Sequence, residues 1–204
     1  SAVTHTRAAA ESDAPHLYNE IPDNVFVETF FGDKDATDAA FDKADHVVKM
    51  SFDIPRVTGV PMEPRSALGH YDPAEDKYMV YAGSGGTVRQ KREIASILGV
   101  ENHQVRVYAL DVGGNFGTRN RLFVEFPLVA WASKKIGRPV KNTVDRSEAF
   151  VSDYQGRDLI VDMELALDAD GTFRALRSSN ISNVGAHCVS LSPLSKGSGI
   201  ITGS

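Results

Sequence analysis

The sequence predicts an α+β fold with a mixed β-sheet. Several short segments alternate apolar and polar residues, some of them flank turn sequences as hairpin strands do, and two glycine-rich loops are followed by helical spacing of apolar residues. Hairpins give antiparallel neighbours, whereas strand–loop–helix–strand connections give parallel ones. We therefore expect hairpins, two helices that follow the glycine-rich loops, and about eight strands in all.

Residues 1–45 are expected to be a linker and a short helix from an upstream region. Residues 24–31 have a short β-like pattern, in which Phe30 and Phe31 either pack on the body or stay exposed. Residues 35–41 carry acids early and alanines throughout, which predicts the helix.

Residues 46–204 are expected to be part of one larger domain that begins with three strands. Residues 46–55 alternate apolar and polar side chains, which predicts a half-buried strand. Segments 66–71 and 77–82 flank the turn sequence Asp-Pro-Ala-Glu-Asp, so they predict a hairpin.

The first glycine-rich loop, residues 83–86, leads into a predicted helix that ends at Gly99. Thr87 and Gln90 match the capping-box pattern at the helix start. The residues expected on its apolar face are Ile94, Ile97 and Leu98. The residues expected on its solvated face are Arg89, Gln90, Lys91 and Arg92.

The second glycine-rich loop has the sequence Asp-Val-Gly-Gly-Asn-Phe-Gly-Thr-Arg at residues 111–119. It follows a predicted strand at 105–110 and precedes a predicted helix that ends at Gly137, with Pro127 either near the helix start or at a kink. Such a loop lets the backbone approach a ligand and directs N–H groups at it, which favours anions. The alternative, a sharp turn that binds nothing, stays open.

The last third of the chain is predicted to contain three more strands. Residues 140–144 read as a strand, and residues 146–151 as one helical turn that begins in a charge cluster. Segments 159–167 and 172–181 flank the turn sequence Asp-Ala-Asp-Gly and predict a second hairpin. The sequence after residue 186 is loop-like.

Composition argues against several classes of function. The formal net charge is −5 and basic residues are dispersed, so nucleic acid is not an expected partner. No run approaches the ~18 apolar residues of a membrane helix. Cys188 is the only cysteine, and neither it nor Ser190 has the histidine arrangement of a nucleophilic site. The six histidines never reach metal-ligand spacing, so no metal-binding residue is predicted.

The second loop resembles the glycine-glycine-glycine-phenylalanine-glycine loop of the xanthine dehydrogenase / aldehyde oxidase / carbon monoxide dehydrogenase family. The likeness extends from near Ala44 to the end of the chain. Further segments that fit the family in order are residues 59–65, 136–141, 145–148, 170–176 and 183–186. Since the chain begins without Met and stops without a closing element, we expect a piece of the first cofactor-binding domain of a longer large subunit.

The resemblance implies a molybdenum–molybdopterin cofactor, in a dinucleotide form, in the parent protein. The residues to which it assigns cofactor contact are Gly114, Asn115, Phe116 and Gly117 in the second loop, and Gly85 and Gly86 in the first. Asn115 stands where the family has glycine, and Gly85 where many members have glutamine. Because asparagine tolerates a positive φ better than most residues, the turn is expected to survive.

Two polar residues near the loops have open or weakly assigned roles. Asn120 stands where some purine-oxidising members of the family carry a substrate-contacting glutamate, which argues against a purine substrate. Glu63 either orients the loops or is exposed and salt-bridged.

The resemblance further implies a molybdenum-dependent dehydrogenase or oxidase that adds water-derived oxygen to an aldehyde, an N-heterocycle or a similar small molecule. Iron–sulfur and flavin subunits or domains are the implied partners, and the bacterial parent is expected in the cytoplasm. The general-base glutamate is expected downstream of this chain, so no catalytic residue is assigned within it. The isolated chain is expected to lack cofactor and activity, and to self-associate through a docking face that includes Phe30, Phe31, Ile200 and Ile201.

Two alternative functions stay open. One is a non-catalytic scaffold domain of the same family, which the departures at Gly85 and Asn115 favour. The other is a nucleotide-dependent dehydrogenase domain. That domain would need a sheet that is parallel throughout, and Val88 stands where its third glycine belongs.

Overall fold

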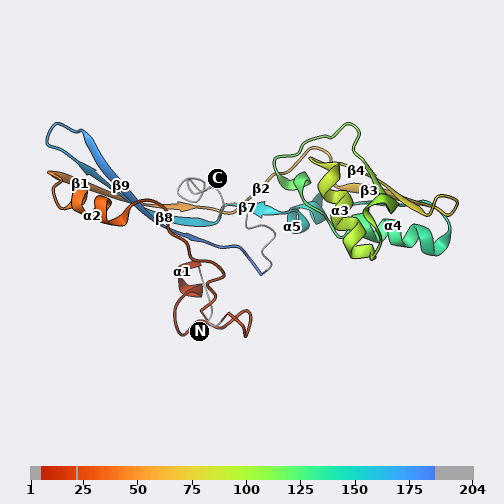
Figure 1. The fold of residues 1–204 in the computed structure, drawn as a ribbon, viewed down its shortest axis with the longest axis horizontal. Coiled ribbons are helices and arrows are strands. Elements are labelled where there is room, and N and C mark those ends of the chain that lie inside the picture. Colours follow the sequence, from red (N-terminus) through yellow and green to blue (C-terminus); the bar gives the residue numbers. More distant parts are fainter. Residues whose placement is uncertain (1–5, 22, 187–204) are drawn as a thin grey trace. The chain divides into compact units, whose positions relative to one another are not determined.

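The computed structural model describes residues 6–21 and 23–186 (Figure 1). The chain divides into two compact units, which are considered separately here. One unit is the continuous segment Thr58–Gln155, and the other combines the residues up to Val57 with those from Gly156 onward. The chain crosses between the units at β2 (Val57–Thr58) and at β7 (Gln155–Gly156). The predicted division of the parent protein at residue 45 stays a prediction.

The discontinuous unit contains a three-stranded antiparallel sheet. The strands are β1 (His46–Ile54), β8 (Leu159–Leu167) and β9 (Phe173–Ser182), in the order β1-β8-β9. The hairpin predicted at 159–181 is therefore confirmed. The same unit also contains two helices, α1 (Thr6–Ala9) and α2 (Lys34–Phe41).

The predicted short helix is confirmed, whereas the strand predicted before it is wrong. Helix α2 begins after Asp33, whose Oδ1 accepts a hydrogen bond from the N–H of Ala36 at 3.0 Å. No strand occurs in the described segment 23–33. Phe30 and Phe31 are 86% and 49% exposed, and neither lies in a strand. Ile200 and Ile201 lie outside the described residues.

Strand β1 was predicted correctly in position but wrongly in burial. Val48, Met50 and Phe52 are 49%, 56% and 40% exposed. The reason is that α2 packs on β9 and leaves β1 without a second layer in the described part of the chain. Alternation in a sequence predicts which side chains share a face, but it cannot say whether anything covers that face.

The continuous unit contains a four-stranded mixed sheet with the order β5-β4-β3-β6. Its strands are β3 (Ser66–Asp72), β4 (Lys77–Ala82), β5 (Val105–Tyr108) and β6 (Val140–Thr143). β3 pairs antiparallel with β4 and with β6, whereas β4 and β5 are parallel. The predicted mixed sheet is confirmed, and a sheet that is parallel throughout is excluded.

Two helices, α3 (Thr87–Leu98) and α4 (Glu125–Ile136), pack on this sheet. A Cβ placed on Gly69 of β3 would lie 2.6 Å from the backbone of α4, so only glycine permits this approach. The buried residues of the core are Ala67, Tyr78, Val80, Ala82, Ile94, Ala95, Val105, Phe123, Phe126, Val129 and Ala130. This core fixes the two strand ends from which the glycine-rich loops emerge.

Short elements complete the continuous unit. They are the 3-10 turns η1 (Asn102–Gln104) and η2 (Thr118–Asn120) and the helix α5 (Arg146–Ser152). The side chain of Asp145 accepts from the N–H of Glu148 at 2.7 Å, which confirms the predicted charge cluster at the start of α5.

Two details of α3 differ from prediction, and the structure decides between the two alternatives for Pro127 in α4. The capping box is wrong, because the N-cap of α3 is Gly86, without a side-chain cap, and Gln90 is buried. Ile97 is 61% exposed rather than part of the apolar face. Pro127 lies in the first turn of α4, where its missing N–H has no helical partner to lose, so the first alternative is the right one and no kink is required.

Candidate functional site

The two glycine-rich loops lie against each other at one edge of the four-stranded sheet. Because β4 and β5 are parallel, the loops that follow them leave the sheet at the same edge. The N–H of Gly85 donates to the carbonyl oxygen of Arg119 at 3.1 Å. A Cβ placed on Gly85 would overlap with Asn120 Oδ1 and Asn115 Nδ2. The loops, separated by more than twenty residues in sequence, therefore form one surface.

The second loop turns through three residues in the left-handed region of φ. Gly114 has φ +117°, Phe116 +49° and Gly117 +86°. The turn is present with asparagine at position 115, as expected, although the positive φ falls on Phe116 and not on Asn115. The Oδ1 atom of Asn115 accepts from the N–H of Gly117 at 3.0 Å, which supports the turn from the side chain. Phe116 is 75% exposed, so the strained residue presents its ring to the surroundings.

Glu63 orients the second loop. The N–H of Gly113 donates to Glu63 Oε2 at 2.7 Å, and the N–H of Glu63 donates to the carbonyl oxygen of Gly113 at 3.1 Å. A Cβ on Gly113 would lie 2.6 Å from the Cβ of Glu63, so this pairing requires glycine. Of the two roles left open for Glu63, the structure selects the loop-orienting one.

Residues 59–62 form a support beneath the second loop. A Cβ on Gly114 would lie 3.1 Å from the Cβ of Pro61, and a Cβ on Gly59 would lie 3.0 Å from Cγ2 of Thr118. Arg146, at the start of α5, holds this support by donating to the carbonyl oxygen of Pro61 at 2.7 Å. Close packing against the chain itself therefore explains the need for glycine at position 114.

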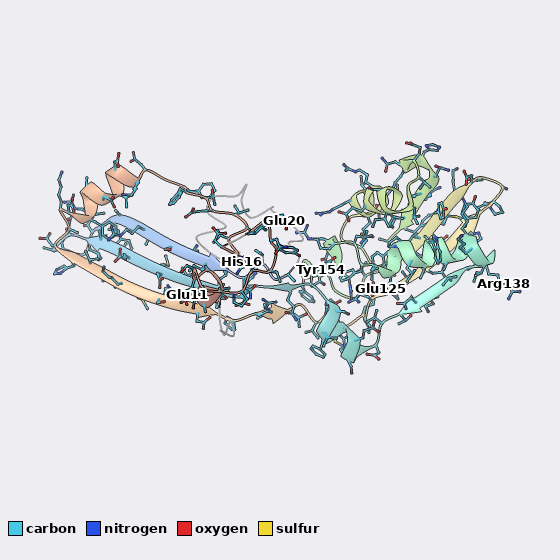
Figure 2. The ribbon with its side chains drawn as sticks, turned by 90° about the horizontal axis from the view of Figure 1, so that it is seen from below. Glu11, His16, Glu20, Glu125, Arg138 and Tyr154 are labelled. Carbon is cyan, nitrogen blue, oxygen red and sulfur yellow. The ribbon has the colours of Figure 1, made fainter. Side chains whose placement is uncertain are left out.

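Two buried arginines, neither singled out from the sequence, anchor the loops from below. The guanidinium of Arg119 donates to the carbonyl oxygen of Glu63 at 2.6 Å, and its Nη1 lies 3.8 Å from Asp153 Oδ1. Arg65 pairs with Asp153 and, at 2.8 Å, with Glu125, which Figure 2 shows at the start of α4. The side chains of both arginines are 2% exposed.

The pKa values of the two arginines shift in opposite directions, although burial disfavours the charge of both. Burial lowers the pKa of Arg119, and the carboxylate of Asp153 compensates only in part. Burial also opposes the charge of Arg65, but the hydrogen bonds that Arg65 donates to the carboxylates of Glu125 and Asp153 outweigh it, so the pKa of Arg65 is raised. Both guanidiniums remain charged, because arginine does not lose its proton in proteins.

Gln90 ties α3 to the second loop. Its Nε2 lies 3.4 Å from the carbonyl oxygen of Arg119 and 3.3 Å from that of Arg121, as a donor to both. The signal that could have shown this is its position one turn before Ile94, on the buried side of the helix. The sequence pattern instead predicted that Gln90 is part of a capping box with Thr87.

Gly86 and Gly117 are the open positions of the combined loop surface. A Cβ placed on either would meet no heavy atom within 4 Å. The N–H of Gly86 donates to Ser84 Oγ at 2.9 Å and that of Gly117 to Asn115 Oδ1 at 3.0 Å. The donors left beside them are the first-turn N–H groups of α3, which has no side-chain cap, and the exposed carboxamide of Asn120. In the described ranges 6–21 and 23–186, no group of three His, Cys, Asp or Glu side chains could hold a metal ion. This donor set fits an organic ligand rich in oxygen or sulfur acceptors, and it does not fit direct metal ligation by the protein.

The mixed sheet thus carries two contacting glycine-rich loops at the ends of neighbouring strands. The chain belongs to the molybdopterin cofactor-binding domain family, whose match spans residues 17–202. Its fold class and its relation to the carbon monoxide dehydrogenase and aldehyde oxidoreductase proteins are thereby confirmed.

Curated relatives and solved structures agree on this family. The 6-hydroxypseudooxynicotine dehydrogenase complex subunit gamma of Paenarthrobacter nicotinovorans is 36% identical, over 77% of this chain and 20% of its own length. The carbon monoxide dehydrogenase large chain of Hydrogenophaga pseudoflava is 32% identical, over 76% of this chain and 19% of its own length. A crystal structure of Cu,Mo-CO dehydrogenase matches 87% of this chain and 24% of its own with a TM-score of 0.78 and 28% identity. The chain spans about a fifth of the length of these curated relatives.

None of the helices among the described residues has both the length and the apolar character needed to cross a bilayer.

Proposed function

We propose that this chain forms part of the cofactor-binding region in the large subunit of a molybdenum hydroxylase. The parent protein would be an oxidoreductase that adds water-derived oxygen to an aldehyde, an N-heterocycle or a similar small substrate. The bound cofactor supplies the redox chemistry by accepting two electrons from the substrate. The chain itself supplies binding and orientation.

The observation that carries this proposal is the open backbone at Gly86 and Gly117, on loops that contact each other. A Cβ on either glycine would meet no heavy atom within 4 Å. At Gly85 and Gly114, by contrast, other atoms of the chain occupy the space where a Cβ would stand. This open backbone lies beside the uncapped first turn of α3 and the exposed carboxamide of Asn120, whose donors suit the oxygen and sulfur acceptors of a molybdopterin. The residues we assign to cofactor contact are Gly85, Gly86, Gly114, Asn115, Phe116 and Gly117.

The structure suggests different roles within this set. Gly86, Phe116 and Gly117 are exposed, so they offer the contact surface itself. At Gly85 and Gly114, neighbouring side chains occupy the space where a Cβ would stand, so these two glycines let the loops pack closely. Asn115 lies between these groups, with its side chain bonded within the loop.

The remaining parts of the proposal rest on the family. We propose a dinucleotide form of the cofactor, iron–sulfur and flavin partners, a cytoplasmic location, and a general-base glutamate outside this chain. Names such as "complex subunit gamma" and "large subunit" among the relatives support a multi-subunit parent. The isolated 204-residue chain would then lack cofactor and activity.

The sharpest test is Gly86→Val in the full-length protein. Gly86 has φ −178°, an extended conformation that valine adopts freely, and a Cβ there would meet no heavy atom within 4 Å. Because Gly86 is the N-cap of α3, where valine is less favourable than glycine, the variant should lose about 1 kcal/mol of stability but stay folded. Its molybdenum and pterin content should fall several-fold, because a branched side chain then blocks the approach of the ligand. Gly114→Val is less informative, since it also disturbs the packing on Pro61.

Gly156→Val provides the matched control. A Cβ on Gly156 also meets no heavy atom within 4 Å, and this residue lies in β7, outside both loops. It should leave both stability and cofactor content unchanged. Full molybdenum and pterin content in a folded Gly86→Val protein would remove the first loop from the proposed site. A wild-type protein without either component would support a scaffold role instead.

A further inference from the structure

A pair of asparagine carboxamides closes the space between the two glycine-rich loops. Asn115 Nδ2 donates to Asn120 Oδ1 at 3.0 Å, and both groups fill the position where a side chain at residue 85 would stand. We infer that Asn115 is a positioning residue that makes the outward end of Asn120 a hydrogen-bond donor. This inference rests on the proposed function, because it concerns a ligand held between the same two loops.

The orientation of both amides follows from one backbone donor. A carboxamide can be turned by half a turn with little change in shape, so its direction is set by its hydrogen-bond network. The N–H of Gly117 can only donate, and it points at Asn115 at 3.0 Å, which requires Oδ1 on that side. Nδ2 of Asn115 must then face Asn120. It can only donate, so Oδ1 of Asn120 faces inward.

The consequence is a free donor at the mouth of the loops. The Asn120 residue is exposed, and no residue in the described part of the chain accepts a hydrogen bond from its Nδ2. This group therefore selects a ligand atom that accepts a hydrogen bond, such as a carbonyl oxygen, a ring nitrogen or an oxyanion. A ligand that offers only a donor at this point would leave Nδ2 opposed by another donor.

Gly85 makes the arrangement rigid. Its N–H is taken by the carbonyl oxygen of Arg119, and the absence of a Cβ leaves the space that the two carboxamides occupy. The amide pair is thus held between the first loop on one side and the Gly117 N–H on the other. A fixed donor costs less conformational entropy on binding than a mobile one.

Asn115→Asp tests the inference without altering Asn120. An aspartate still accepts from the Gly117 N–H, so the turn is kept. Its second oxygen can only accept, so Asn120 must turn its amide and donate inward. The outward end of Asn120 then becomes Oδ1, an acceptor. Asn142→Asp, at an exposed position of β6, is the matched control for the added charge.

The measurement uses the full-length, cofactor-loaded protein and two probes of the same shape. 3-Methylpyridine carries a ring nitrogen acceptor, whereas toluene has none. Calorimetric titration should show that the wild type and Asn142→Asp bind 3-methylpyridine about tenfold more tightly than toluene, as expected for one good hydrogen bond. Asn115→Asp should lose this preference, and Asn120→Ala should lose it as well.

Molybdenum and pterin analysis of the same proteins distinguishes the two sources of the acceptor. If the acceptor belongs to the cofactor, Asn115→Asp and Asn120→Ala should both lower cofactor content several-fold, with no probe preference in the wild type. If it belongs to the substrate, the content stays full and the preference is lost. An Asn115→Asp protein with unchanged content and unchanged probe binding overturns the inference. A wild type without molybdenum and pterin contradicts the proposed function before any variant is compared.

Discussion

Glu63 and Gly113 are joined by two hydrogen bonds, one from each backbone N–H. The Gly113 N–H reaches the carboxylate of Glu63 at 2.7 Å, and the Glu63 N–H reaches the Gly113 carbonyl oxygen at 3.1 Å. The first of these is charge-assisted and therefore the stronger. Through this pair, the segment that precedes β3 sets the position of the loop that follows β5.

Glu63→Ala should loosen the second loop while leaving the fold intact. Losing a hydrogen bond to a charged group costs about 1.5–3 kcal/mol, and the partial exposure of Glu63 places the expected loss near the lower value. Urea unfolding of the full-length protein measures it, and cofactor content should fall in parallel. Glu75→Ala is the control, because its carboxylate is 61% exposed and pairs only with Lys77. Equal effects of the two substitutions would contradict an orienting role for Glu63.

Gly85→Ala should destabilise the protein through the two asparagines that face it. The new Cβ would overlap with Asn115 Nδ2 and Asn120 Oδ1, the ends of side chains that can turn away, so the expected cost is the lost hydrogen bond between them, about 0.5–1.5 kcal/mol. In a background with Asn115→Gly and Asn120→Gly, the same substitution should cost almost nothing. Urea unfolding midpoints of the four proteins give the coupling energy. A cost at Gly85 that does not depend on the asparagines would mean that the loops are not interlocked.

Asp153→Asn should be among the most damaging single changes in the chain. Asp153 is the shared carboxylate of Arg65 and Arg119, and all three side chains are 2% exposed. Removing one partner from a buried ion pair costs about 3–5 kcal/mol, because the other charges remain buried. Asp168→Asn removes an ion pair with Arg174 whose side chains are 25% and 45% exposed, so it should cost less, about 1 kcal/mol. Similar unfolding energies for the two variants would contradict the burial argument.

The fold was largely predictable because its signals are local. Hairpin turns, apolar alternation and the glycines that end α3 and α4 each act within a few residues, and they placed most strands and both long helices. The errors arose where a local pattern had a nonlocal competitor. Gln90 fitted a capping box, but the carbonyl oxygens of Arg119 and Arg121 hold its side chain from another part of the chain.

The site was predictable in outline and not in its detail. The glycine pattern marked both loops, and parallel strand order brought them together. No sequence rule distinguishes an arginine such as Arg119, buried beneath a loop, from an exposed one, because the difference depends on contacts with Glu63 and Asp153. The sequence likewise did not show that Phe116, and not Asn115, has the positive φ. In the structure the side chain of Asn115 accepts a hydrogen bond from the N–H of Gly117.

Stability of the three-stranded sheet should fall in acid through Glu164. Hydrogen bonds from Lys49 and then Arg177 lower the pKa of Glu164 below its ordinary value of 4.5. A carboxyl group whose pKa is lower in the folded state contributes stability above the unfolded-state pKa and loses it as pH falls through the folded-state pKa. The melting temperature of the 204-residue chain should therefore drop below about pH 4.5 more steeply than that of Glu164→Gln. Parallel melting curves for both proteins across this range would contradict the assignment.

The isolated chain should self-associate through apolar side chains that its own fold leaves uncovered. Met50 and Phe52 on β1 are 56% and 40% exposed, Phe173 on β9 is 72% exposed, and Phe30 is 86% exposed. Exposed apolar side chains of this size usually bind a partner where they form a contiguous patch. Static light scattering should show a mass that rises with concentration, and Met50→Lys with Phe52→Lys should suppress the rise because two buried like charges would oppose association. Lys91→Glu on α3 is the control and should change nothing. A strict monomer at millimolar concentration would show that these residues do not form a docking face.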